Sequence, residues 1–294
     1  MNDDYEFPFL EGEVGETVDA ATVLSIYSDE PDWGPDQELR LSWQQKFMGG
    51  YTGKTSRGYL HCYYPAGSFN IPVPGIPMGM TPKRIDQIFA LVKEAVSKDD
   101  LYWALRFTAW ALHYIQDLTQ PYHSTQTRPS FYWKEDFPMG FVKGTTKVTT
   151  NYHFAYEGFA SYRLKRELDG LEERFLLDAL NEGNHSTLES LEDLKCFAKK
   201  TAKRSHDLSK EAFNVSKAFF GEKFFQDQTV RPDESDYTKI GEANSKEELR
   251  RNLYEGFELI GFATRSICEH LHYLLDEREA HRRHLAEDFL FSRD

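Results

Sequence analysis

The segment that most constrains the fold is a long apolar run that ends in a cluster of metal-ligand residues. Residues 101–124 read LYWALRFTAWALHYIQDLTQPYHS, and the first ten carry a single charge, Arg106. A run that is apolar on nearly all sides predicts a central, buried helix over about 100–118, which Pro121 ends. His113 and Asp117 are four residues apart and therefore share one face. A carboxylate there is costly unless it is paired or binds a metal.

A second pair of the same kind follows in NYHFAYEGF, where His153 and Glu157 are again four residues apart among aromatic side chains. Two helices that each present a histidine and a carboxylate at this spacing are a common way to build a metal site in a helical protein. Imidazole nitrogen with carboxylate oxygen suits Zn²⁺, with Mn²⁺ or Fe²⁺ as alternatives. No cysteine lies in the pattern, which argues against a structural zinc site of the cysteine type.

The rest of the chain predicts one all-α domain. Thr81-Pro82 starts a helix whose apolar stripe includes Ile85, Phe89 and Val96. We expect residues 1–21 to form an arm, 22–160 a metal-binding core and 161–294 a helical remainder, without strands or repeats. Long loops are expected at 28–80, which is rich in Gly and Pro, and at 124–152. Further helices are expected from near 151 and over 171–183, 187–221 and 245–288.

Composition excludes several classes of function. The formal charge is −13, which argues against a global basic surface for duplex DNA. Bound cations could still attract a phosphate ester to an acidic protein. No apolar run approaches 18 residues, the length typical of a membrane span, and the acidic N-terminus lacks the parts of a signal peptide. Three cysteines do not make a disulfide framework.

The spacing H-x3-D-x5-H followed by H-x3-E resembles the signature of the zinc-dependent phospholipase C and S1/P1 nuclease superfamily. The resemblance covers roughly residues 23 to 160 and implies that family's all-α fold. It also implies an upstream Asp, often before an aromatic residue, and then a His. EPDWG supplies Asp32 before Trp33, and GYLHCYYP supplies His61. The stretch between them is longer than is usual in the family, so Asp29 and Asp36 remain alternatives to Asp32.

By resemblance, one zinc would be held by four residues: Asp32, His61, His113 and Asp117. A second zinc would be held by His123, His153 and Glu157. The family holds a third zinc with an N-terminal Trp, an early His and the shared helical carboxylate, here Asp117. Because this chain begins with Met1 and has no His before His61, the resemblance supports two zinc ions and leaves the third doubtful.

The resemblance implies hydrolysis of a phosphodiester by zinc-activated water, with Asp32 orienting or deprotonating that water. Phospholipid is the favoured substrate, which would involve transient contact with a membrane surface. Trp33 fits one headgroup-binding position, but Gly58 does not fit another. The residue after the first His, which stacks on a base in nuclease relatives, is Cys62, although Tyr63 follows. A single-strand nuclease and an inactive, metal-stabilised binding domain remain alternatives. The family also implies a secreted or periplasmic protein.

Overall fold

The computed structural model describes residues 15–33, 58–65, 77–125, 141–184, 193–226, 228–238 and 243–291. Most of these residues are helical, so the expected all-α class is confirmed. The elements are α1 (Ala20–Tyr27), α2 (Glu30–Trp33), α4 (Gly58–His61), β1 (Tyr63–Tyr64), β2 (Met78–Gly79), α5 (Thr81–Ser97), α6 (Leu101–Asp117), α7 (Pro121–Ser124), α8 (Phe141–Leu168), α9 (Phe175–Asn184), α10 (Leu194–Phe220), a 3₁₀ helix (Glu222–Phe224), α11 (Glu234–Tyr237) and α12 (Ala243–Phe291).

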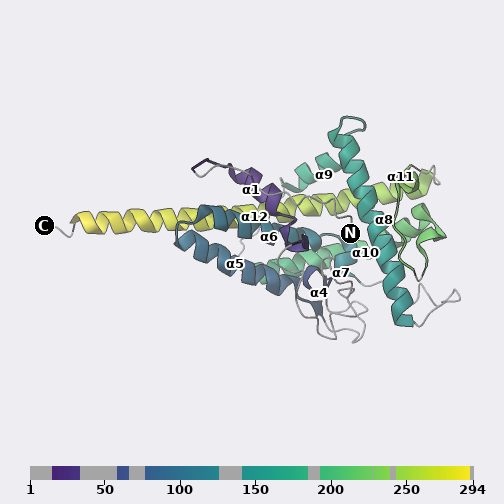
Figure 1. Cartoon of the computed structure of the whole chain (residues 1–294), viewed down its shortest axis with the longest axis horizontal. Helices are drawn as coiled ribbons and strands as arrows, with labels where there is room; N and C mark the ends of the chain where they lie inside the picture. Colours follow the sequence, from purple (N-terminus) through teal and green to yellow (C-terminus); the bar gives the residue numbers. More distant parts are fainter. Residues whose placement is uncertain are drawn as a thin grey trace.

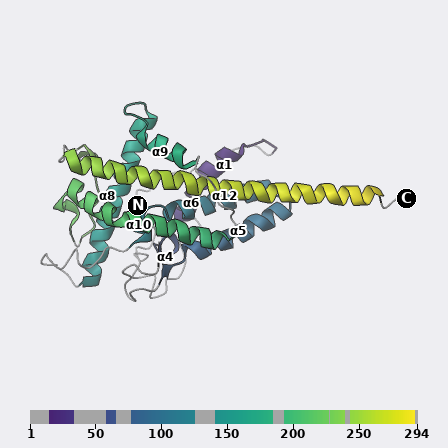
Figure 2. The same ribbon diagram turned by 180° about the vertical axis from the view of Figure 1, so that it is seen from behind.

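Helix α12 is the longest element, with 49 residues, and the other helices are arranged along it (Figure 1). It packs against α9, α10, α6 and α5, and its C-terminal part projects beyond them, as the view from behind also shows (Figure 2). The approach of α9 is close, because a Cβ at Gly183 would lie 1.9 Å from the carbonyl oxygen of Glu258. Glycine is therefore required where these two helices meet.

Helices α5 and α6 form an antiparallel pair that bears the first half of the candidate site. Their boundaries follow from local chemistry: Pro82 lies in the first turn of α5, and the Asp100 carboxylate caps α6 at the Trp103 amide. The apolar stripe predicted for α5 is buried, including Ile85, Phe89 and Val96. It packs on α6, α10 and α12 in a core that fixes the direction in which α6 presents its last turn.

Helix α8 is longer than the sequence predicts. It begins at Phe141, so residues 141–152 belong to a helix and not to the expected loop; residues 126–140 lie outside the described part of the chain. The stretch FVKGTTKVTT is poor in helix-forming residues, since it holds a glycine and several β-branched side chains. Val148 and Tyr152 are buried in a second apolar cluster with residues of α10 and α12, and this packing outweighs the weak propensity.

A short hairpin corrects the expectation of no strands and an irregular 28–80 segment. Tyr63 pairs with Gly79, and Tyr64 with Met78, in an antiparallel two-stranded sheet. Gly79 has a φ of +109°, and a Cβ there would lie 2.0 Å from the Cys62 carbonyl oxygen. The Thr81 hydroxyl lies 2.7 Å from the Leu60 carbonyl oxygen and 2.9 Å from that of Cys62. The hairpin and Thr81 thus anchor the segment that carries His61.

Other boundaries differ modestly from the predictions. Pro121 does not end the central helix, which stops at Asp117; it begins α7 instead, because proline suits a first helical position. Helix α1 begins at Ala20, inside the expected arm, and residues 1–14 lie outside the described range. The predicted helices 171–183, 187–221 and 245–288 correspond to α9, α10 and α12. None of the helices in the described ranges is long and apolar enough to cross a membrane.

Candidate metal centre

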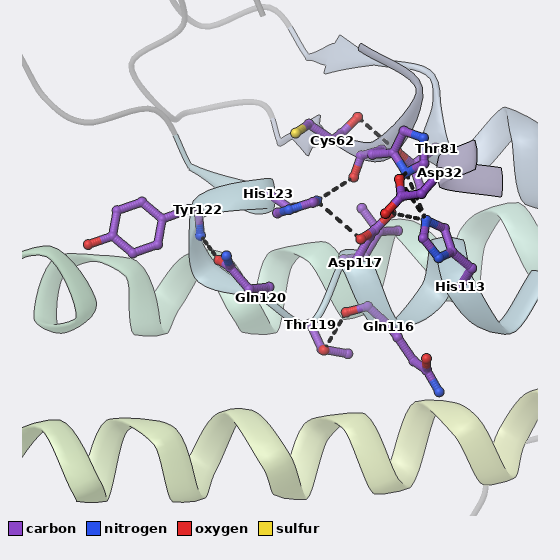
Figure 3. Close-up of polar contacts among 12 residues, drawn as sticks. Asp32, Cys62, Thr81, His113, Gln116, Asp117, Thr119, Gln120, Tyr122 and His123 are labelled. Atoms are coloured by element: carbon purple, nitrogen blue, oxygen red, sulfur yellow. Dashed lines mark hydrogen bonds and ion pairs between the residues drawn. The ribbon is translucent and has the colours of Figure 1, made fainter. Parts of the chain in front are cut away.

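Three short elements (α2, α4 and α7), the C-terminal end of α6 and the middle of α8 meet at one place in the fold. The last turn of α6 presents His113 and Asp117, and α7 presents His123 a few residues later (Figure 3). Gln116 points the other way and donates to the Thr264 hydroxyl on α12 at 3.0 Å, which holds the end of α6 in place. Asp117 is therefore turned toward the histidines, as the sequence pattern predicts for the face it shares with His113.

The first group consists of Asp32, His61 and His113, each of which offers a ligand atom within 4.8 Å of the others. His61 Nδ1 lies 3.0 Å from His113 Nε2. Asp32 Oδ1 lies 3.6 Å from His113 Nε2 and 3.8 Å from His61 Nδ1. Both histidines are buried, whereas the Asp32 side chain is about half exposed (48%), so Asp32 lies on the open side of this group.

The second group consists of His123, His153 and Glu157, whose ligand atoms also lie within 4.8 Å of one another. His123 Nε2 is 3.0 Å from His153 Nε2, which in turn is 2.8 Å from Glu157 Oε1. The ring of Tyr122 stacks on His153 with an interplanar angle of 5° and supports it from one side. Nitrogen, nitrogen and oxygen donors converge here as they do in the first group.

Asp117 lies between His123 of the second group and His113 and Asp32 of the first group (Figure 3). Its Oδ2 is 2.8 Å from His61 Nδ1 and 3.4 Å from His113 Nε2, and its Oδ1 is 3.5 Å from His123 Nδ1. Burial alone would raise the pKa of this carboxyl group, but the three surrounding imidazoles outweigh burial and lower the pKa below its usual value. Asp117 is consequently an anion at neutral pH, shared by both groups.

The ring of His123 is oriented by a backbone contact. Its Nδ1 is 2.9 Å from the carbonyl oxygen of His61, and only an N–H can make a hydrogen bond to a carbonyl. In the neutral ring this contact places the proton on Nδ1 and leaves a lone pair on Nε2, the atom that faces His153. Such a second contact that fixes the tautomer is typical of metal-binding histidines.

The pKa values of the outer residues reflect their surroundings. Burial opposes a charge on His123, yet Asp117 and the other nearby groups outweigh it and raise the pKa of His123 well above its usual value. Burial likewise disfavours ionised Glu157, but His153 and His123 hold the pKa of Glu157 well below normal. For Asp32, desolvation by the surrounding protein dominates and raises the pKa, against the attraction of His113 and His61.

Two polar contacts that the sequence pattern did not single out position these ligands. Gln120 caps α7 through its side-chain oxygen, which accepts from the Tyr122 amide, and its Nε2 donates to Glu157 Oε1 at 3.1 Å. On α6, Arg106 and Trp110 bind Glu30, two residues before Asp32. Arg106 could have been noticed in the sequence as the lone charge in an apolar helix. Nothing in the sequence marked Glu30 or Gln120 as residues that position the ligands.

All seven residues predicted as ligands lie together: Asp32, His61, His113, Asp117, His123, His153 and Glu157. Of the alternatives to Asp32, Asp29 is exposed and belongs to neither group, and Asp36 lies outside the described residues. Of the predicted substrate-binding residues, the backbone of Trp33 ends α2, but its side chain lies outside the described part. Tyr63 is half-buried in β1 and packs against the main core.

Each group can hold a metal ion, as the chemistry of its donors indicates. In neutral His123 the Nε2 lone pair faces a second imidazole nitrogen at 3.0 Å, with a carboxylate oxygen beside them. Once His123 has lost its proton, a cation between these atoms could be coordinated by two nitrogens and one oxygen. Comparison of the chain with models of protein families, with curated proteins and with solved structures found no match.

Proposed function

We propose that the protein is a zinc-dependent phosphodiester hydrolase of the phospholipase C type. The observation that carries the proposal is the position of Asp117, with one oxygen toward His61 and His113 and the other toward His123. A carboxylate in this place can serve two cations at once, and two neighbouring cations are a recurrent arrangement for phosphoryl-ester hydrolysis. The resemblance of the ligand spacings to the phospholipase C and S1/P1 nuclease superfamily supports the same assignment, including its fold.

Zinc is the metal that the donors favour. Each group offers two imidazole nitrogens and at least one carboxylate oxygen, a mixture that suits Zn²⁺ better than Mg²⁺ or Ca²⁺, which prefer oxygen alone. Mn²⁺ and Fe²⁺ accept the same donors and are the alternatives. We propose two zinc ions: Asp32, His61, His113 and Asp117 would hold one, and His123, His153 and Glu157 would hold the other.

Bound zinc would polarise a phosphoryl oxygen and lower the pKa of water toward neutrality. The chain itself supplies a base at Asp32, whose carboxylate is half exposed and adjoins both histidines of the first group. A zinc ligand beside the attacking water needs only modest basicity, because bound zinc would supply most of the acidification of that water. In this proposal Asp32 accepts the proton of the attacking water, and Asp117 remains ionised throughout.

The proposed substrate is a phospholipid, reached by transient contact with a membrane surface. The net charge of −13 disfavours long polyanions such as duplex DNA, whose binding depends on many basic contacts. A phospholipid presents a single phosphodiester, which two cations can attract without a basic surface around them. The proposed contacts for the lipid headgroup are Trp33, which is the last residue of α2, and Tyr63, which follows α4 in strand β1.

The test is an activity assay on the purified chain loaded with zinc. Release of phosphocholine from a short-chain phosphatidylcholine is the expected result, and it should be lost in Asp32→Asn. Release of 5′-nucleotides from single-stranded DNA instead would replace the phospholipase proposal with a nuclease. If a chain that holds two zinc ions hydrolyses neither substrate, nor a simple aryl phosphodiester, then hydrolysis is wrong and the centre serves binding or stability.

A further inference from the structure

Arg106, the one charged residue in the first half of α6, forms a largely buried ion pair with Glu30. Arg106 Nε donates to Glu30 Oε2 at 2.8 Å, and its Nη2 donates to Glu30 Oε1, so the guanidinium grips both carboxylate oxygens. Trp110 Nε1 adds a third hydrogen bond to Oε2 at 2.6 Å. Glu30 is only 6% exposed. A fork-to-fork pair of this kind fixes geometry as well as charge.

The guanidinium group also lies over two aromatic rings. Its carbon lies 4.3 Å from the ring centre of Tyr27 and 4.8 Å from that of Trp103. The Tyr102 hydroxyl donates to the Tyr27 hydroxyl at 2.8 Å, which ties the end of α1 to the first turn of α6. Arg106 is therefore held by the carboxylate of Glu30 and by two aromatic rings.

These contacts set the register between the α1–α2 segment and α6. Arg106, Trp110 and His113 follow one another at spacings of four and three, so they form a single row along α6. The facing segment contacts this row in the same order. Tyr27 and then Glu30 meet Arg106, Glu30 also meets Trp110, and Asp32 meets His113. Fixing Glu30 on Arg106 thus fixes which residue arrives opposite His113.

We propose that the Arg106–Glu30 pair is a positioning device that delivers Asp32 to the first metal group. Helix α2 has four residues and cannot hold its own position in water. Asp32 itself is half exposed and reaches the histidines only at 3.6 and 3.8 Å. Arg106 is a positioning residue that acts through Glu30. The inference depends on the proposed function only because it takes Asp32 to be a metal ligand.

The first test is a zinc titration of Arg106→Gln. The variant should lose about 10- to 100-fold in zinc affinity at the first group, as is usual when an outer partner of a ligand is removed, and keep the affinity of the second group. Asp32→Asn and Glu157→Gln, titrated alongside, identify which binding step belongs to which group. Arg106→Lys should recover only part of the lost affinity, because an ammonium group cannot bind both oxygens of Glu30 in a fork.

A matched control is available in a second ion pair of similar burial. Arg163 on α8 pairs with Glu172, and their side chains are 11% and 21% exposed, compared with 17% and 8% for Arg106 and Glu30. Arg163→Gln should leave both zinc affinities unchanged within twofold. Circular dichroism of each variant establishes that the helices are retained. Selective loss at one group, with partial rescue by lysine, is a result that general destabilisation does not produce.

Two results would overturn the inference: an unchanged first zinc affinity in Arg106→Gln, or an equal loss at both groups. If Arg106→Gln fails to fold, Glu30→Gln removes the charge with almost no change in size, and the same comparison applies to it. A wild-type chain that binds no zinc refutes the proposed function and this inference together. A wild-type chain that binds two zinc ions, combined with an unaffected Arg106→Gln, refutes the inference alone.

Discussion

At the scale of single residues, Asp117 determines the character of the site. A lone buried carboxylate would be destabilising, yet this one faces three imidazoles that lower its pKa below the usual value. Removing its charge would leave the histidines of both groups without their common partner. Each of the other candidate ligands belongs to one group, so substituting them would distinguish the two proposed metal sites experimentally.

The first residue-scale prediction distinguishes two nearby aspartates. Asp32→Asn should weaken zinc at the first group by at least about tenfold and lower kcat by roughly 100-fold or more, because it removes both a ligand and the proposed base. Asp29→Asn is the matched control: it changes an exposed acid three residues away that belongs to neither group. Zinc titration and the phosphocholine-release assay measure the two effects. Equal effects of the two substitutions would show that Asp32 has no special role.

The second residue-scale prediction concerns the dependence of zinc affinity on pH. Because the pKa of His123 is raised, the metal-free protein holds a proton there that must leave before zinc binds. Asp117 and Glu157 have lowered pKa values and stay ionised across the neutral range. Zinc affinity should therefore rise with pH, by up to about tenfold per pH unit for one displaced proton, until the pH passes the raised pKa. Competition titrations between about pH 6 and about pH 8 measure it; a flat profile contradicts it.

The ligands themselves were predictable from the sequence, but their supports were not. Histidine and carboxylate at a spacing of four on an apolar helix is a local pattern, so His113 with Asp117 and His153 with Glu157 could be found by inspection. The contact of His123 with the His61 carbonyl and the grip of Arg106 on Glu30 join residues that are 62 and 76 positions apart. Local patterns in a single sequence do not reveal which distant residues pair in this way.

At the scale of secondary-structure elements, the site depends on a small hairpin beside α4. Strand β2 runs antiparallel to β1, which follows His61. The close approach of Gly79 to the Cys62 backbone fixes the position of the main chain next to the His61 carbonyl group. Strands of two residues are too short for any periodic pattern, which explains why the sequence did not reveal them. In α8 the sequence predicted a loop where the structure has a helix, because burial of Val148 stabilises a segment whose helix propensity is low.

The substitution Gly79→Ala tests how strongly the fold depends on the close packing of the hairpin. The substitution combines a φ of +109° with a Cβ that would lie 2.0 Å from a carbonyl oxygen, so it should lower the free energy of unfolding by about 3 kcal/mol or more. Gly170→Ala is the control, because Gly170 also has a positive φ of +71° but has no atom within 4 Å of the added Cβ. It should cost only about 1 kcal/mol. Urea denaturation measures both, and equal costs would contradict the tight packing at Gly79.

At the scale of the whole molecule, the candidate metal centre joins segments that are distant in the sequence. Ligands come from α2, α4, α6, α7 and α8, while α12 supports the end of α6 through Thr264. Metal binding should therefore stabilise the fold as a whole and not one element alone. The all-α class and the main helices followed from periodicity and capping residues, whereas the way in which α8 crosses the other helices depends on packing that periodicity does not encode (Figure 1).

Chelation tests this global effect. Removing zinc with excess chelator should lower the Tm by at least about 5 °C, because a site filled at about 100 times its Kd contributes about 2.7 kcal/mol. Adding zinc back should restore the original Tm, and Asp117→Asn should show little change on chelation. Differential scanning calorimetry measures each case. Identical Tm values with and without chelator would mean that the centre is not coupled to folding.

The central claim is that the chain binds two zinc ions side by side, with Asp117 as a ligand of the first and in contact with His123 of the second. Elemental analysis of the purified chain, after removal of loosely bound metal, measures this most directly. We expect two zinc ions per wild-type chain, and weakened binding at both sites in Asp117→Asn. A wild-type chain that retains one zinc ion or none, or an Asp117→Asn variant that binds two as tightly as wild type, would contradict it.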